Sequence, residues 1–110
     1  MSEYNGYTNR ATWLVSLWMY NSEGVRDYWV DRGRMIYKHN AKPQKYFTKM
    51  EDATIIFAED IKTAHEEMLW DAMGQNTANL WYDLLNNSMA DVDWRQIAKN
   101  LLEDVELEVS

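Results

Sequence analysis

Six carboxylates within a twenty-residue stretch are the side chains best placed to act together: Asp52, Glu59, Asp60, Glu66, Glu67 and Asp71. On a helix that advances about 100° and 1.5 Å per residue, Asp52, Glu59 and Glu66 form a row with steps of about 10.5 Å. Asp60 and Glu67 lie beside this row, and Asp71 lies at the edge of the apolar stripe of the same helix. Successive phosphates of a nucleic-acid strand are about 7 Å apart, so the row has a similar scale and the same charge. The pattern predicts an acidic helix face that fits a groove lined by Lys and Arg and built for DNA or RNA. A solvated helix face that only keeps the protein in solution has the same pattern.

Metal binding and catalysis find little support in the sequence. The chain has no cysteine, and neither His39 nor His65 follows a Glu at the spacing used by helical metal sites. The segment His65-Glu66-Glu67-Met68-Leu69 lacks the second histidine of an H-E-x-x-H site. No phosphate-binding glycine loop accompanies the carboxylates. We therefore expect no metal, no cofactor and no enzymatic activity.

The basic residues lie mainly in the other half of the chain. Residues 1–50 carry eight Lys or Arg and four Asp or Glu, whereas residues 51–110 carry three and fourteen. Arg26, Arg32, Arg34 and Lys38 alternate with aromatic residues, a composition typical of surfaces that grip a nucleic-acid backbone. The same side chains could instead complement the acidic half of the protein or a second copy of the chain. The overall pI of about 4.7 argues against autonomous nucleic-acid binding.

Helical periodicity dominates the elements that must position these groups, and it predicts an all-α protein: a compact bundle of about five helices in one domain, residues 1–110. Thr8 and Ser22 are the expected starts of the first two helices. Thr48 and Glu51 form a capping box for the third helix, which Gly74 ends. The fourth begins near Thr77, and Asp91 or Asp93 caps the fifth.

The apolar positions predict which face of each helix is buried. The first helix is apolar nearly all round, at Trp13, Leu14, Leu17, Trp18 and Met19, which indicates a central position. Four further stripes are expected to face the core: Val25, Tyr28, Trp29 and Ile36; Ala53, Phe57, Ile61, Ala64, Met68 and Ala72; Leu80, Trp81, Leu84 and Leu85; and Trp94, Ile97, Ala98, Leu101, Leu102 and Val105. The chain has six Trp and seven Tyr, so we also expect exposed aromatic anchors, with Tyr4, Tyr7, Tyr20 and Tyr82 as candidates.

Two segments carry a family resemblance. Residues 5–18, NGYTNRATWLVSLW, and residues 92–102, VDWRQIAKNLL, resemble the opening and the closing helix of small phage and mobile-element proteins. Those proteins share an N-G-x-T-N-x-x-T-W-x-V-x-L-W start and a V-D-W-x-x-I-A closing helix. The resemblance implies an accessory role in a host cell and carries no catalytic residues. Both segments also have a structural interpretation, as helix starts followed by core aromatics.

Taken together, the residues and the resemblance predict a cytoplasmic inhibitor of a host defence system. The acidic face would bind a host defence protein in its positively charged nucleic-acid channel, as an anti-CRISPR or anti-restriction protein. One alternative is an accessory phage protein that touches nucleic acid through its basic-aromatic half, and another is a small homodimeric structural module. No apolar run approaches the roughly 18 residues that a membrane span requires.

Overall fold

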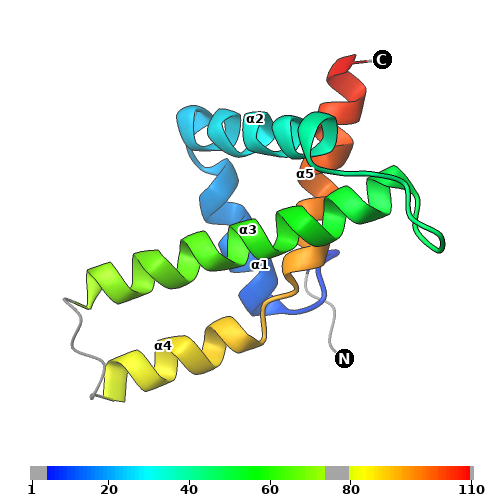
Figure 1. Ribbon diagram of the computed structural model, residues 1–110. Helices are drawn as coiled ribbons and strands as arrows, with labels where there is room; N and C mark the ends of the chain where they lie inside the picture. Colours follow the sequence, from blue (N-terminus) through cyan, green and yellow to red (C-terminus); the bar gives the residue numbers. More distant parts are fainter. Residues whose placement is uncertain (1–4, 74–79, 110) are drawn as a thin grey trace.

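The computed structural model describes residues 5–73 and 80–109, with side chains to Val105, and it is all-α within that part of the chain. Its helices are α1 (Arg10–Tyr20), α2 (Glu23–His39), α3 (Lys49–Ala72), α4 (Leu80–Ala90) and α5 (Trp94–Val109). Figure 1 shows that α5 runs steeply across α3 and reaches α2, whereas α4 lies alongside the C-terminal half of α3. The expected helix end at Gly74 and helix start at Thr77 lie outside the described residues.

The core lies where α2, the first half of α3 and α5 meet. Phe57, Ile61, Ile97, Leu101 and Leu102 are its largest fully buried apolar side chains. The predicted stripe of α5 is confirmed at every position from Trp94 to Val105. The α3 stripe is confirmed from Ala53 to Ile61, which is the part of α3 that α2 and α5 cover.

Gly33 lets α2 approach the other two core helices closely. A Cβ atom at this position would lie 2.8 Å from Cε2 of Phe57 and 3.3 Å from Cδ2 of Leu102. Both neighbours are fully buried and have little room to move. The glycine that weakens α2 as an isolated helix is therefore what allows it to pack.

The predicted caps are confirmed at two helices and shifted at a third. Thr48 Oγ1 accepts a hydrogen bond from the Glu51 amide at 3.0 Å, and Glu51 Oε1 accepts one from the Thr48 amide at 2.7 Å. Asp93 caps α5, because its Oδ1 accepts from the Gln96 amide at 3.1 Å. The first cap is Asn9 rather than Thr8, since Asn9 Oδ1 accepts from the backbone amide of Thr12.

Thr8 does not cap α1, because its hydroxyl and its backbone amide bond to residues at the start of α5. Its hydroxyl donates to Asp93 Oδ2 at 2.6 Å, and its amide donates to Gln96 Oε1 at 2.8 Å. Gln96 Nε2 donates in turn to the carbonyl of Gly6, 90 residues earlier. Gly6 has φ 87°, a backbone conformation that favours glycine. The segment before α1 is thus hydrogen-bonded to the start of α5.

A second set of bonds continues this connection, which we call the end clamp: Gly6, Thr8, Asn9 and Thr12 bonded to Asp91, Asp93 and Gln96. The Asp93 amide donates to Thr12 Oγ1 at 2.8 Å, and Asn9 Nδ2 donates to the Asp91 carbonyl at 2.7 Å. Thr12 is fully buried. The two segments that carry the family resemblance therefore bind each other. Their interpretation as helix starts is supported, and Trp94 is a core aromatic, but Trp18 is exposed and is not one.

The central position expected for α1 is wrong. Leu14, Leu17 and Trp18 are 42%, 44% and 66% exposed. The buried edge of α1 consists instead of Thr12, Ser16 and Met19. Hydrogen bonds satisfy both buried hydroxyls, because Ser16 Oγ lies 3.0 Å from the Tyr7 hydroxyl and Thr12 is held in the end clamp. The inner face of α1 thus consists of Met19 and two small hydrogen-bonded side chains, while Leu14, Leu17 and Trp18 lie outside.

The apolar stripe predicted for α4 is also not in the core. None of the residues of α4 is buried, and its four large apolar side chains are 47–65% exposed. Val25 and Tyr28 of α2 and Met68 and Ala72 of α3 are exposed as well.

Candidate functional site

Two of the six predicted carboxylates are engaged within the molecule. Asp60 accepts from Arg32 through both oxygens, at 2.8 Å from Nε and 2.9 Å from Nη2. This contact raises the pKa of the Arg32 guanidinium, through the hydrogen bond first and the charge of Asp60 second. Asp52 Oδ2 accepts from the backbone amide of Lys42 at 2.9 Å. The expectation that Asp52 and Asp60 belong to a free ladder is therefore corrected.

The other four carboxylates are exposed, and three of them line one concave surface. Glu66, Glu67 and Asp71 surround an open hollow of about 440 Å³ between α3 and α4, which we call the acidic hollow. Its remaining lining comes from Thr63, Trp70, Tyr82 and Asn86. Glu59 lies further along α3, outside this lining.

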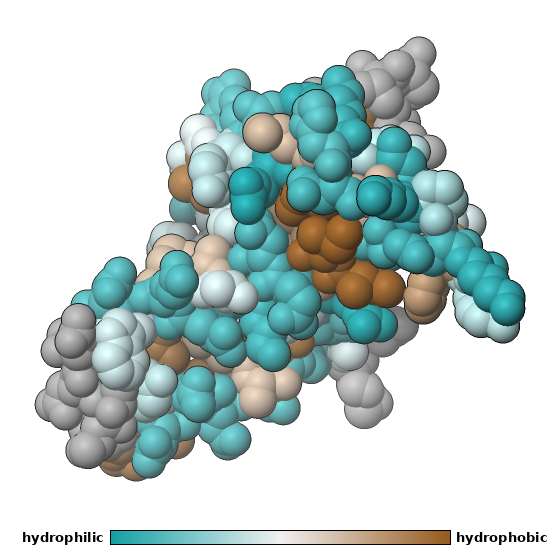
Figure 2. Space-filling model, viewed as in Figure 1, coloured by the Kyte–Doolittle hydropathy of each residue, from teal (hydrophilic) through white to brown (hydrophobic). Residues whose placement is uncertain are grey.

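The charges around the acidic hollow are not balanced by neighbouring sequence. Residues 63–94 contain six Asp or Glu and no Lys or Arg. Lys62 lies at the border, where it lines a smaller hollow together with Glu66 and Trp94. In Figure 2, hydrophilic residues cover most of the visible surface over α3 and α4. The field at this end of the molecule is negative.

The chemistry of the acidic hollow is that of a cation receptor. Its carboxylates accept charge-assisted hydrogen bonds from guanidinium or ammonium groups, and Trp70 is 41% exposed, with ring surface that a cation can contact. Among the residues that the structure describes, no three His, Asp or Glu side chains gather as a metal site. The acidic hollow is therefore chemically suited to binding a guanidinium or ammonium group.

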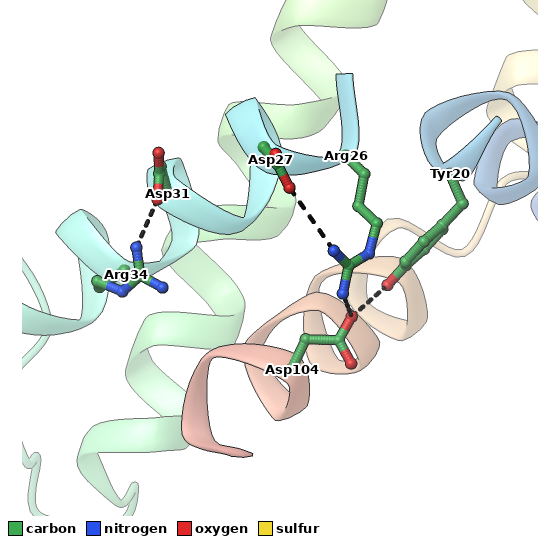
Figure 3. A network of polar contacts seen from close by, with 6 residues as sticks. All are labelled: Tyr20, Arg26, Asp27, Asp31, Arg34 and Asp104. Carbon is green, nitrogen blue, oxygen red and sulfur yellow. Dashed lines mark hydrogen bonds and ion pairs between the residues drawn. The ribbon is translucent and has the colours of Figure 1, made fainter. Parts of the chain in front are cut away.

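The predicted basic surface is mostly occupied by internal ion pairs (Figure 3). Arg26 lies 3.6 Å from Asp27 and 3.7 Å from Asp104, and Arg34 pairs with Asp31. With Arg32 bound to Asp60, each of the three arginines contacts a carboxylate of this chain. The alternative in which these side chains complement the protein's own acids is confirmed for Arg26 and Arg32. Lys38, the fourth predicted residue, is exposed.

Asp104 ties this network to α1. The Tyr20 hydroxyl donates to Asp104 Oδ2 at 3.1 Å, and burial together with the charge of Asp104 raises the pKa of the Tyr20 phenol. Tyr20 and Tyr7 are thus half-buried, hydrogen-bonded residues and not free anchors. The strongly exposed aromatics are Trp18, Tyr28, Tyr46 and Trp81. Tyr82 lines the acidic hollow, and Tyr4 lies outside the described residues.

Sequence reasoning missed an aromatic groove on the other side of α3. Its volume is about 610 Å³, and its walls come from α1, α2 and α3, including Trp18, Tyr28 and Met68. His65 lies in its wall between Trp29 and Trp94, with ring centroids 5.9 and 5.4 Å away. His65 Nδ1 lies 2.8 Å from the Ile61 carbonyl, and burial lowers the pKa of the imidazole. Ala64 and Met68, which continue the apolar stripe of α3, predicted that this face is apolar. They did not predict that it is exposed.

The described part of the chain is all-α, with an acidic hollow between α3 and α4. This chain belongs to DUF7249, a family of unknown function, whose match covers residues 1–107. No curated protein and no solved structure matches the chain. Within the described part of the chain, no helix combines the length and the apolar character that crossing a membrane requires.

Proposed function

We propose that this protein is a non-enzymatic inhibitor that binds a nucleic-acid-binding protein and competes with its DNA or RNA. The acidic hollow and Glu59 would occupy the positively charged channel of that partner. The observation that carries the proposal is the hollow itself, in which Glu66, Glu67 and Asp71 converge within a 32-residue stretch without Lys or Arg.

The spacing of these carboxylates supports competition with a phosphate backbone. Glu59 and Glu66 are two helical turns apart, about 10.5 Å, and Glu67 and Asp71 are about 6 Å apart along the axis. A long helix holds them in a fixed order, so the partner does not have to order a flexible acidic segment. The unbalanced charge would also speed association with a cationic channel.

We also propose a more specific biological setting for this binding, which rests on the sequence resemblance to phage and mobile-element proteins. In that setting the partner is a host defence factor in the cytoplasm, such as a CRISPR effector or a restriction enzyme. Both classes bind nucleic acid through cationic channels, so the acidic hollow suits either one.

The test is affinity capture of partner proteins from lysate of the host cell, with the full chain as bait. A variant with the exposed acids neutralised, Glu59→Gln/Glu66→Gln/Glu67→Gln/Asp71→Asn, should lose the captured partner. A matched control removes four other exposed acids and should keep it: Glu23→Gln, Asp27→Asn, Asp31→Asn and Glu103→Gln. Added DNA or RNA should release the partner, and binding should weaken steeply with salt.

Two results would reject the proposal. One is a partner that binds the neutralised variant as well as the wild type. The other is direct capture of nucleic acid that a Lys38→Glu variant abolishes, which would favour the basic-aromatic surface instead.

A further inference from the structure

Helix α4 has its apolar side turned away from the rest of the protein. With Leu80 at 0°, Leu84, Trp81 and Leu85 lie at about 40°, 100° and 140°, so they form one stripe. Their exposed fractions are 65% for Leu80 and Trp81, 48% for Leu84 and 47% for Leu85. In Figure 2, brown surface is visible along the margin of α4 opposite α3. We call these four residues the α4 stripe.

The opposite edge of α4 makes the contact with α3. Tyr82, Asn86 and Met89 lie at about 200°, 240° and 180° on the same scale. Tyr82 and Asn86 line the acidic hollow, and Met89 is partly buried against the core cluster. The α4 stripe and the acidic hollow are therefore separate surfaces on two edges of one helix.

An eleven-residue helix without a buried residue lacks the packing that stabilises short helices. Isolated helices shorter than about 12–15 residues are marginal in water, so most of their stability comes from burying one face. Helix α1 has the same length but already buries Thr12, Ser16 and Met19. Among the described residues none buries the apolar face of α4, so a partner that covers it would add the packing that α4 lacks.

We propose that the α4 stripe is the interface of a homodimer, in which α4 of one copy packs antiparallel against α4 of a second copy across a two-fold axis. In this arrangement Leu80 of one copy opposes Leu85 of the other, and Trp81 opposes Leu84. The same patch serves both copies, as a two-fold interface requires.

The charges favour a second copy as the occupant. The α4 stripe contains no charged residue, and α4 as a whole contains no Lys or Arg and a single acid, Asp83, outside the stripe. In the paired arrangement each α3 axis is separated from its counterpart by three helix–helix spacings of about 8–10 Å, or about 24–30 Å when the four helices lie in one layer. This is about three times the Debye length of ~8 Å at physiological salt, so the carboxylates of the two acidic hollows oppose pairing only weakly.

The area is that of a weak but specific dimer. The exposed parts of the four side chains amount to roughly 450 Å² in each copy, or about 900 Å² of apolar surface when two stripes meet. This lies somewhat below the roughly 1,200 Å² at the lower end of specific interfaces, so the dimer should be weak. We expect a dissociation constant in the micromolar range.

The experiment is sedimentation velocity of the full chain from about 1 µM to about 200 µM, the range over which an interface of this size dissociates. The wild type should convert from monomer to dimer. Leu84→Glu/Leu85→Glu should raise the dissociation constant at least tenfold. The matched control Leu14→Glu/Leu17→Glu places the same charges on side chains of similar exposure in α1, and it should dimerise like the wild type.

A crosslinking variant keeps the test independent of any loss of folding. The chain has no cysteine, so Leu84→Cys introduces a single thiol that a short bismaleimide should link between copies. Leu17→Cys, treated in the same way, should stay uncrosslinked. A wild type that remains monomeric at about 200 µM, or a dimer that only the α1 variant dissociates, would overturn the proposal.

The dimer does not depend on the proposed function. Neutralising Glu66, Glu67 and Asp71 should leave the dissociation constant of the dimer unchanged or lower it, because no carboxylate contributes to the stripe. If the wild type captures no partner but still forms the dimer, only the proposed function fails. If it captures the partner but stays monomeric, only the dimer proposal fails.

Discussion

The two halves of α3 lie in different surroundings. Its first half is enclosed by α2 and α5, and Ala53, Phe57 and Ile61 are fully buried there. Its second half has α4 beside it, the acidic hollow on one side and the aromatic groove on the other. One end of the molecule therefore holds the buried core of the fold, and the other end carries its exposed acidic and apolar surfaces.

The two ends should differ most in how much stability is lost when an apolar side chain is truncated. Phe57→Ala should lower the free energy of unfolding by about 3–5 kcal/mol, because it leaves a cavity among fully buried neighbours. Leu84→Ala removes a half-exposed side chain and should cost less than about 1 kcal/mol. Urea titration followed by circular dichroism at low protein concentration measures both. Equal losses would show that the two ends do not differ as described.

The end clamp should contribute less than the core and more than any surface contact. Thr12→Val leaves the half-buried Asp93 amide without its acceptor, which should cost about 1–3 kcal/mol. Thr12→Ser keeps the hydroxyl and should recover most of that loss. Thermal denaturation of the two variants gives the answer, and equal melting temperatures would mean that the hydrogen bond is not what matters at this position.

His65 connects the two ends and should make stability depend on pH. The unfolded chain binds a proton at this imidazole near pH 6.5, whereas burial lowers its pKa in the folded protein. The unfolded state therefore holds more protons in the interval between the two pKa values, and stability should fall as the pH drops through it. The urea midpoint of the wild type should decrease between about pH 7.5 and about pH 5.5.

A His65→Gln variant should lose that part of the decrease. The control is His39→Gln, which removes an exposed histidine at the end of α2 and leaves His65 in place. It should behave like the wild type. A His65→Gln variant that retains the full pH dependence would assign it to other groups.

The smallest expected effect is that of the Arg32–Asp60 ion pair. The two side chains are 43% and 28% exposed, so solvent screens the pair despite its bidentate geometry. A double-mutant cycle with Arg32→Gln and Asp60→Asn should give a coupling of about 0.2–1 kcal/mol that decreases with salt. A coupling that salt leaves unchanged would indicate a contact shielded from solvent.

The sequence predicted best those elements whose signals are local. The capping box of Thr48 and Glu51 and the full stripe of α5 follow from residues within a few turns of each other, and both are confirmed. It predicted the α4 stripe as a stripe but put it in the core, because periodicity locates an apolar face without saying what lies opposite. For α1 the sequence did not predict that polar side chains would be buried. The hydroxyls of Thr12 and Ser16 lie inside because they bond to residues outside the helix.

The candidate site was predictable in composition and not in geometry. Glu66, Glu67 and Asp71 stand together on the helix as expected, and the hollow that they line depends on how α4 returns along α3. The loss of Asp60 from the ladder was not foreseeable, because Arg32 lies 28 residues earlier and meets it only through the crossing of α2 and α3. Contacts between distant residues decided which predicted acids remained free.

The end clamp has a consequence for the order of folding during synthesis. Its two sides, residues 5–12 and 91–96, are joined by hydrogen bonds between residues 81 to 90 positions apart, so they can meet only after residues 91–96 have left the ribosome. Until then the opening segment has no partner for its hydrogen bonds, and closing so long a loop carries an entropic penalty. We expect nascent chains shorter than about 96 residues to remain incompletely folded and exposed to proteases, with docking of α5 as the final event.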